Sequence, residues 1–207
     1  MPDLTLGFDT SAAHCAVALL SDGRIVASAH QDMTKGQAET LFPMMEQVLA
    51  DAGRAWADLD VIGVGVGPGN FTGIRVSVAA ARGLALSLGI PAVGVSSLDA
   101  LRHGTAAQVA SLDARQGRLY VQVGDDAPVL CDMDSLPPLP QGAGCVGDHA
   151  DQIAARCGGH VVAPAMPLTH AIADIAATRP DAPRPAPLYL RAADAAPARD
   201  APPVILP

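Results

Sequence analysis

The spacing of apolar residues changes near residue 36, and this change restricts the possible folds most strongly. Three strand-like segments precede it, Leu4–Asp9, Cys15–Leu20 and Arg24–Ala29, and a Ser21-Asp22-Gly23 turn joins the last two. Strands that follow one another through such short connections predict an antiparallel meander. The chain is therefore expected to begin with a sheet and not with a helix bundle.

The segment after residue 36 has helical spacing. Its apolar residues from Leu41 to Ala52 fall on one face of a helix that ends at Gly53, and Pro43 must either begin or kink this helix. The elements expected next are a strand, a helix, a strand and a third helix: Asp60–Val66, Ile74–Leu88, Ala92–Val95 and a helix capped by Ser96 or Ser97. The order β-β-β-α-β-α-β predicts an α/β fold.

The second half of the chain is less regular and shows no internal sequence repeat. The expected elements are strands at Val109–Leu112 and Arg118–Val123, helices at Ala150–Cys157 and Thr169–Thr178 (with Thr169 as cap), and one edge strand at Leu188–Leu190. We divide the chain into a first lobe, residues 1–103, and a truncated second lobe, residues 104–207, whose proline-rich end is expected to be extended or disordered.

Charge and hydropathy argue against two classes of protein. The chain carries 13 Lys and Arg against 21 Asp and Glu, a net charge of −8, which repels phosphate backbones, so tight nucleic-acid binding by this chain alone is not expected. The longest run without charge, Gly83–Leu98, is shorter than the roughly 20 apolar residues of a membrane-spanning helix, and the first residues do not resemble a signal peptide. We expect a cytoplasmic protein whose four cysteines are buried thiols.

The glycine-rich segment Gly67–Gly73 lies between a predicted strand and a predicted helix. Gly67, Gly69 and Gly73 permit close backbone approach, and the start of a helix attracts anions, so a phosphate site is one interpretation. The segment lacks both the lysine of a Walker loop and the spacing of a dinucleotide-binding fingerprint. The other interpretation, which the spacing alone favours, is a tight turn that lets the helix lie close to the sheet.

Asp9, Thr10 and Ser11 end the first strand and place a carboxylate beside two hydroxyls. One interpretation is the turn of a tight hairpin, and the other is a loop that faces phosphate or Mg²⁺. No recognisable metal or nucleophile motif accompanies them in the sequence. The six histidines form no H-x-x-x-H pair, and the chain has no G-x-S-x-G elbow.

The second predicted helix is apolar almost all round. Arg75 and Arg82 are its only charges, so the side that faces the sheet and the opposite side both need cover. The first helix adds an adaptable, methionine-containing surface. These helices either pack on each other or form an interface with another protein chain, and the two interpretations are compatible. The residues assigned to that interface are Leu41, Met44, Met45, Val48, Ile74, Arg75, Val78, Ala81 and Arg82.

Several segments together resemble one protein family. They are Gly7–Ser11, Cys15–Leu19, Gln37–Pro43, Gly67–Arg75, Gly94–Leu101, Asp113–Arg115 and Pro187–Arg191. The G-P-G-x-F-T-G-x-R element of residues 67–75 is the most specific, and the resemblance is dense over residues 4–101. These segments resemble the TsaB family, also called YeaZ, whose members are paralogues of TsaD.

The resemblance implies an actin-like ATPase fold of the ASKHA, RNase H-like class, with one complete lobe and a shortened second lobe. It also implies a non-catalytic subunit for the N6-threonylcarbamoyladenosine (t6A37) modification of tRNAs that read ANN codons. The implied partners are TsaD, which is the transferase, and TsaE, which is an ATPase. A homodimer is expected when the chain is alone, and tRNA is expected to be held only through the complex.

The resemblance further implies that this chain has no metal site and no catalytic residue. TsaD binds its metal through two histidines four residues apart, and the corresponding residues here are Ser97 and Leu101, which cannot supply an imidazole pair. We expect no resident cofactor, although ATP or ADP could lie at the partner junction. The alternative function is a stand-alone nucleotide-binding ATPase or phosphotransferase of the same fold, for which the short second half leaves little to bind adenosine.

Overall fold

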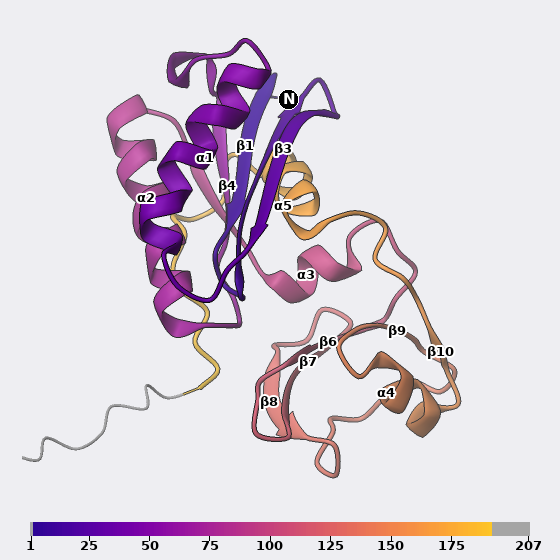
Figure 1. Ribbon diagram of the computed structural model, residues 1–207. Coiled ribbons are helices and arrows are strands. Elements are labelled where there is room, and N and C mark those ends of the chain that lie inside the picture. Colours follow the sequence, from indigo (N-terminus) through magenta and orange to yellow (C-terminus); the bar gives the residue numbers. More distant parts are fainter. Residues whose placement is uncertain (1, 192–207) are drawn as a thin grey trace, which may run out of the picture.

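The computed structural model describes residues 2–191, which form two lobes around two five-stranded sheets (Figure 1). The first sheet has the order β3-β2-β1-β4-β5. Its strands are β1 (Leu4–Asp9), β2 (His14–Ser21), β3 (Arg24–Asp32), β4 (Val61–Gly65) and β5 (Ala92–Val95). The first three strands form an antiparallel meander, and β4 and β5 continue the sheet parallel to β1. The predicted meander and the mixed α/β fold are confirmed.

Helices cover both faces of the first sheet. Helices α1 (Gln37–Asp51) and α2 (Phe71–Leu88) lie on one face, and α5 (Leu168–Thr178) lies on the other (Figure 1). Strands β1 and β4 are therefore buried along their whole length, and their residues are mostly apolar. Edge strand β3 instead has no buried residue. Pro43 lies inside α1, after its first turn, so it does not begin this helix.

Two glycines in the central strands let α5 come close to the sheet. A side chain at Gly7 would meet Ala173 within 2.8 Å, and one at Gly63 would meet Ala176 at the same distance. Alanines on the helix and glycines on the strands therefore form a thin, close-packed layer. This packing joins a helix from the end of the described chain to strands from its beginning.

The second sheet repeats the topology of the first, although the sequence shows no repeat. Its order is β8-β7-β6-β9-β10, again an antiparallel meander followed by two parallel strands. Helix α4 (Ala150–Cys157) connects β9 to β10, as α2 connects β4 to β5. The strands are β6 (Val109–Asp113), β7 (Arg118–Val123), β8 (Val129–Asp132), β9 (Gly144–Gly147) and β10 (His160–Val161).

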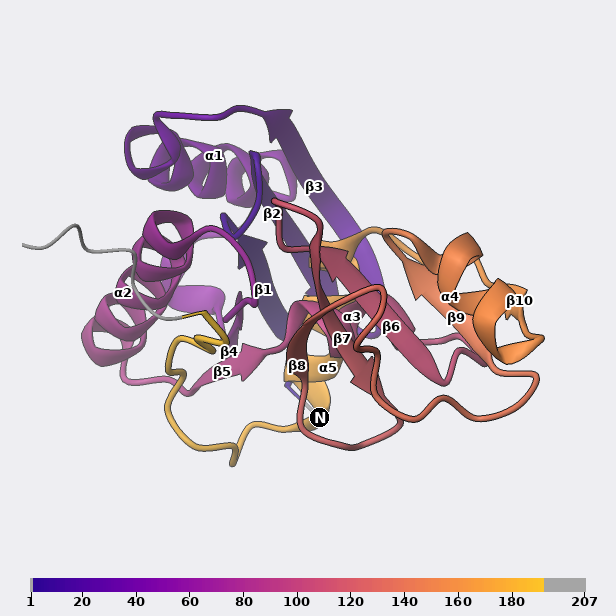
Figure 2. The same ribbon diagram turned by 90° about the horizontal axis from the view of Figure 1, so that it is seen from below.

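One helix that follows each sheet in the sequence packs against the sheet of the other lobe. Helix α3 (Ser97–Arg102) follows the first sheet and packs against β6 and β9 of the second, whereas α5 follows the second sheet and packs on the first. The two helices also contact each other (Figure 2). The sequence-based boundary at residues 103/104 falls between α3 and β6, and α5 crosses back over it.

Several details differ from the sequence-based expectations. Strands β8, β9 and β10 and a 3-10 turn at Trp56–Asp58 were not predicted. Thr169 is a buried residue inside α5, and Pro167 holds the cap position, so the predicted cap is wrong. Residues Leu188–Leu190 form no regular strand, but the Leu188 N–H donates to the Val66 carbonyl at 2.8 Å. All four cysteines are buried and free, as expected. The rest of the proline-rich end, residues 192–207, lies outside the described residues.

Candidate functional site

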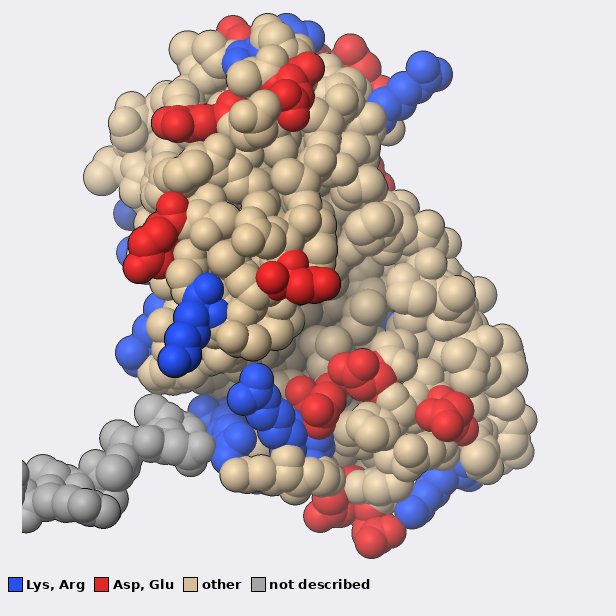
Figure 3. Space-filling model, in the orientation of Figure 1, with Lys and Arg blue, Asp and Glu red and all other residues tan. Residues whose placement is uncertain are grey.

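A cleft of about 820 Å³ lies between the two lobes, and Figure 3 shows the molecule hollowed there. The first lobe contributes the loop after β1 and the glycine-rich segment, residues 68–71. The second lobe contributes the β6–β7 turn and Tyr120, and residues 188–191 complete the wall. Both loops that the sequence analysis selected for a phosphate site therefore meet at this cleft.

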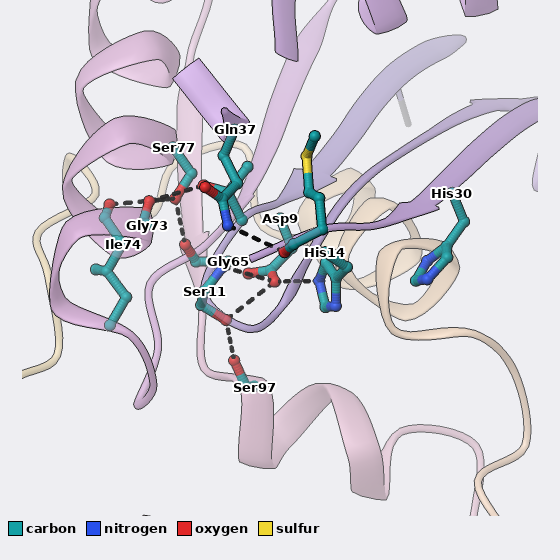
Figure 4. A network of polar contacts seen from close by, with 12 residues as sticks. Asp9, Ser11, His14, His30, Gln37, Gly65, Gly73, Ile74, Ser77 and Ser97 are labelled. Carbon is teal, nitrogen blue, oxygen red and sulfur yellow. Dashed lines mark hydrogen bonds and ion pairs between the residues drawn. The ribbon is translucent and has the colours of Figure 1, made fainter. Parts of the chain in front are cut away.

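A buried carboxylate organises the loop after β1. Asp9 is fully buried, and its Oδ2 atom accepts hydrogen bonds from the Ser11 N–H and hydroxyl, both at 2.9 Å (Figure 4). The same oxygen lies 2.7 Å from Nε2 of His14. The other oxygen, Oδ1, is buried without a hydrogen-bond partner among the described residues and lies against Gly65, where any side chain would overlap it.

This network does not have the order of a hydrolytic triad. In a triad the histidine hydrogen-bonds the nucleophilic hydroxyl and the carboxylate orients the histidine. Here the Ser11 hydroxyl and the His14 ring both bond to Asp9, and the second neighbour of the Ser11 hydroxyl is the Ser97 hydroxyl at 3.5 Å. The backbone and hydroxyl donors of Ser11 are thus directed at a carboxylate of the protein itself.

The glycine-rich segment packs directly on the loop after β1. A side chain at Gly73 would overlap the Thr10 carbonyl, and one at Gly69 would overlap the Ser11 carbonyl. The Thr10 hydroxyl donates to the Gly73 carbonyl at 2.7 Å, and the Asn70 N–H donates to the Ser11 carbonyl at 2.6 Å. Close packing thus accounts for Gly69 and Gly73, as the tight-turn interpretation requires. A role near phosphate for Asp9, Thr10, Ser11, Gly67, Gly69 and Gly73 stays a prediction.

Most residues assigned to the partner interface lie in the core of the first lobe. The buried ones are Leu41, Met45, Val48, Ile74, Val78 and Ala81. The apolar stripes that the sequence analysis selected are the sides of α1 and α2 that face the sheet, so these six assignments are corrected here. Met44 is half-buried, and only Arg75 and Arg82 are exposed.

The exposed apolar side chains of these helices belong to residues that the sequence analysis did not select. Leu86 is 84% exposed on α2 and Phe42 is 43% exposed on α1. Ala79 and Gly83 are also exposed, and they lie two turns and one turn before Leu86, respectively. Because α2 is apolar on all sides, its sequence does not show which side faces the sheet. The packing of α2 against β4 in the folded chain shows it. In the described chain, α2 alone has the length and composition of a membrane span, but its inner side belongs to the core.

Ser97 and Leu101, which the sequence analysis aligned with the histidine pair expected in TsaD, lie on α3. Ser97 is buried beside Ser11, and Leu101 lines the cleft. Within residues 2–191 no three His, Cys, Asp or Glu side chains are grouped so that they could hold a metal ion.

Burial, and then the nearby Asp9 charge, raises the pKa of the Cys15 thiol to about 11.

Relatives and solved structures agree on one family. A family model described as TsaD, tRNA N6-adenosine threonylcarbamoyltransferase, matches residues 28–133. TsaB of Escherichia coli (strain K12) is 34% identical over 122 residues, 56% of this chain. An uncharacterized protein of Mycobacterium tuberculosis (strain ATCC 25618 / H37Rv) is 36% identical over 173 residues, which cover 79% of each chain. The structure of YeaZ from Pseudomonas aeruginosa superposes with a TM-score of 0.71 and 25% identity, covering 86% of this chain and 92% of that one.

The chain belongs to the TsaB (YeaZ) family. The resemblance found in the sequence and the actin-like, RNase H-like fold class are both confirmed. The match spans about half the length of E. coli TsaB, 52%, whereas YeaZ from P. aeruginosa is covered almost completely. The TsaB fold therefore extends over both lobes described above.

Proposed function

We propose that this chain is a non-catalytic subunit required for the N6-threonylcarbamoyladenosine modification of tRNAs that read ANN codons. In this proposal it pairs with the transferase TsaD and with TsaE in the cytoplasm, and it forms a homodimer when no partner is present. The observation that carries the proposal is family membership, because curated relatives are named tRNA threonylcarbamoyladenosine biosynthesis proteins.

The exposed side of α2, together with Phe42 of α1, is the surface that we assign to TsaD. Its centre contains Ala79 and Gly83, whose small size lets a helix of another chain approach closely. Leu86, the most exposed large apolar side chain of the described chain, lies one turn further on the same side. Small residues beside an exposed leucine provide the flat apolar centre that protein interfaces use.

The hydrogen bonds at the cleft favour the proposed role as a non-catalytic subunit over the alternative role as a stand-alone ATPase or phosphotransferase. An enzyme that holds ATP phosphates at this loop needs amide and hydroxyl donors that point into the cleft. Both donors of Ser11 instead point to Asp9. In our proposal ATP or ADP lies only at the junction with the partner, and the chain alone with ATP and Mg²⁺ releases no phosphate above background.

Co-elution with TsaD of the same organism tests the assigned surface. The Ala79→Glu/Leu86→Glu variant is expected to fold with an unchanged free energy of unfolding, because both side chains lie outside the core. It should no longer co-elute with TsaD in gel filtration, since two carboxylates would have to be desolvated at the interface. Val129→Glu/Val161→Glu is the matched control, because both residues are exposed apolar residues of the second lobe, 40% and 57%, and the variant also adds two carboxylates.

Depletion of the chain in its host tests the function itself. We expect the t6A content of bulk tRNA, measured by mass spectrometry of nucleosides, to fall on depletion. The wild type and the control variant should restore it, and the double variant should not. Unchanged t6A after depletion would refute the function, whereas unchanged co-elution of the double variant would refute only the assigned surface.

A further inference from the structure

An arginine and two aromatic rings form a stacked unit at the mouth of the cleft. Phe71 and Arg75 lie in the first two turns of α2, and Tyr189 lies more than a hundred residues later. The rings of Phe71 and Tyr189 have centroids 4.6 Å apart, and Cζ of Arg75 lies 3.8 Å from the Phe71 centroid. Nε of Arg75 donates to the Tyr189 hydroxyl at 3.0 Å, so these contacts fix the positions of all three side chains.

Two further arginines line the same cleft from other segments. Arg191 follows Tyr189 closely, and its Nη2 donates to Oε1 of Gln116 at 3.0 Å. Arg115 belongs to the β6–β7 turn, where its positive φ of 61° and a hydrogen bond from its N–H to Asp113 fix the backbone. Together Phe71, Arg75, Arg115, Tyr189 and Arg191 form what we call the arginine–aromatic rim.

The charge of the rim is opposite to that of the chain. The whole sequence has a net charge of −8, yet three arginines from three segments meet at this cleft. Figure 3 shows basic side chains gathered on the left where the two bodies meet, next to acidic ones. The acidic residues of the cleft wall, Asp113 and Asp148, accept backbone N–H groups of Arg115 and Asp113. Three arginines against two aspartates give the cleft lining a net charge of +1 (3 − 2), which favours an anion at a place where aromatic faces are available.

Aromatic rings beside arginines are the usual means of binding unpaired nucleotides. Bases stack on the rings and on guanidinium planes, and arginines contact the phosphates. Tyr189 is 43% exposed as a residue, so a base can reach its side chain. The cleft volume of about 820 Å³ is within the range of small-molecule sites and accommodates a nucleotide.

We infer that the arginine–aromatic rim binds unpaired nucleotides of an RNA loop, with a base against Tyr189 and phosphates at Arg115 and Arg191. The inference rests on the proposed function, in which the complex acts on tRNA, and goes beyond it because this chain itself touches the RNA. A free nucleotide offers the same base and phosphate chemistry, and the test below separates the two sources. The net negative charge of the chain keeps this contact weak without a partner.

The test uses a fluorescently labelled anticodon stem-loop and measures binding by anisotropy at several salt concentrations. RNA binding by the full chain is measured both without and with TsaD. In a parallel titration, ATP and ADP are added to test whether they displace the RNA. Arg115→Glu/Arg191→Glu should weaken RNA binding at least tenfold and lower the salt slope by about 1.4, since each lost contact to single-stranded phosphate removes about 0.7. Tyr189→Ala should weaken RNA binding about 5- to 150-fold, and Tyr189→Phe should keep most of the affinity because stacking remains.

Arg24→Glu/Arg54→Glu is the matched control, because both residues are exposed arginines outside the cleft. It carries the same change in net charge and should lose less affinity than the rim variant. RNA binding that falls in the rim variants and not in the control supports the inference. Equal loss in rim and control variants, no RNA binding in either preparation, or binding of ATP or ADP alone overturns it. Co-elution with TsaD, measured on the same variants, should persist and reports separately on the proposed function.

Discussion

Single glycines decide how closely the two loops at the cleft can pack. We predict that Gly73→Ala lowers the free energy of unfolding by about 2–3 kcal/mol, because its methyl group would overlap the Thr10 carbonyl, which belongs to rigid backbone. Gly83→Ala on the same helix should instead raise it by about 0.5–1 kcal/mol, since no atom lies within 4 Å of the added carbon. Urea unfolding at two protein concentrations measures both effects and separates them from self-association. Equal effects of the two substitutions would contradict the packing described here.

The buried Cys15 thiol should make the fold less stable in alkali. Its pKa is about 11 in the folded chain because burial, and then Asp9, disfavour the thiolate, whereas its ordinary value is 9.0. The unfolded chain therefore loses this proton first, and the stabilisation present below pH 9 is lost as the pH rises towards 11. In Cys15→Ala the free energy of unfolding should fall less steeply over that interval. Urea titrations at pH 8, 9 and 10 measure the slopes, and parallel curves would refute the assignment.

At the candidate site, the sequence analysis identified functional residues that are neighbours in the sequence. It missed residues that come into contact only when the chain folds. Asp9, Thr10 and Ser11 were selected because a strand ends there, and parallel β1 and β4 bring the glycine-rich segment to the same edge. His14 was not selected, since its bond to Asp9 depends on how the hairpin turns. The contact of Arg75 with Tyr189 spans 114 residues and leaves no local pattern in the sequence.

The start of α2 depends on the side chain of Asn70. Its Oδ1 atom accepts the Gly73 N–H at 2.9 Å and caps the helix, while its own N–H ties the helix to Ser11. We predict that Asn70→Ala destabilises the chain by about 1 kcal/mol, and that Asn70→Ser keeps most of the stability because a hydroxyl also caps. Thermal and urea unfolding of the three proteins measure this. A loss in Asn70→Ser as large as in Asn70→Ala would show that the cap contributes little.

Elements of the first lobe were predictable because their patterns are long and regular. Strands β1 and β5 were predicted with the observed bounds, and α1 and α2 within a few residues. The sequence could not reveal which side of α2 faces the sheet, because both sides are apolar, and this misplaced the partner surface. Strand β5 has four residues, as many as β8 and β9, so length alone does not explain why β8, β9 and β10 were missed. These three strands lie after Asp125 in a segment rich in proline and glycine, where no regular spacing marks where a strand begins or ends.

The two lobes are joined because α3 packs on the second sheet and α5 packs on the first. No local pattern in the sequence predicts this crossing. The topology of the first sheet recurs in the second, yet α5 belongs to the second half in sequence and to the first sheet in space. Residues Ile172, Ala173 and Ala176 of α5 are fully buried on that sheet. A boundary drawn at residues 103/104 therefore separates the first sheet from the helix that covers one of its faces.

This arrangement predicts that residues 1–103 do not fold on their own. Without α5, the face of β1 and β4 that carries Gly7 and Gly63 would be exposed to water. The stabilising free energy from burying the apolar surface of that face would then be lost. We expect the 1–103 fragment to aggregate or to unfold without a cooperative transition, and a chain of residues 1–191 to unfold cooperatively. A third protein, in which residues 165–180 are fused to residue 103 through a flexible linker, should recover a cooperative transition if α5 supplies the missing cover. Circular dichroism during heating compares the three, and a cooperative transition in the 1–103 fragment would show that the first lobe is complete without α5.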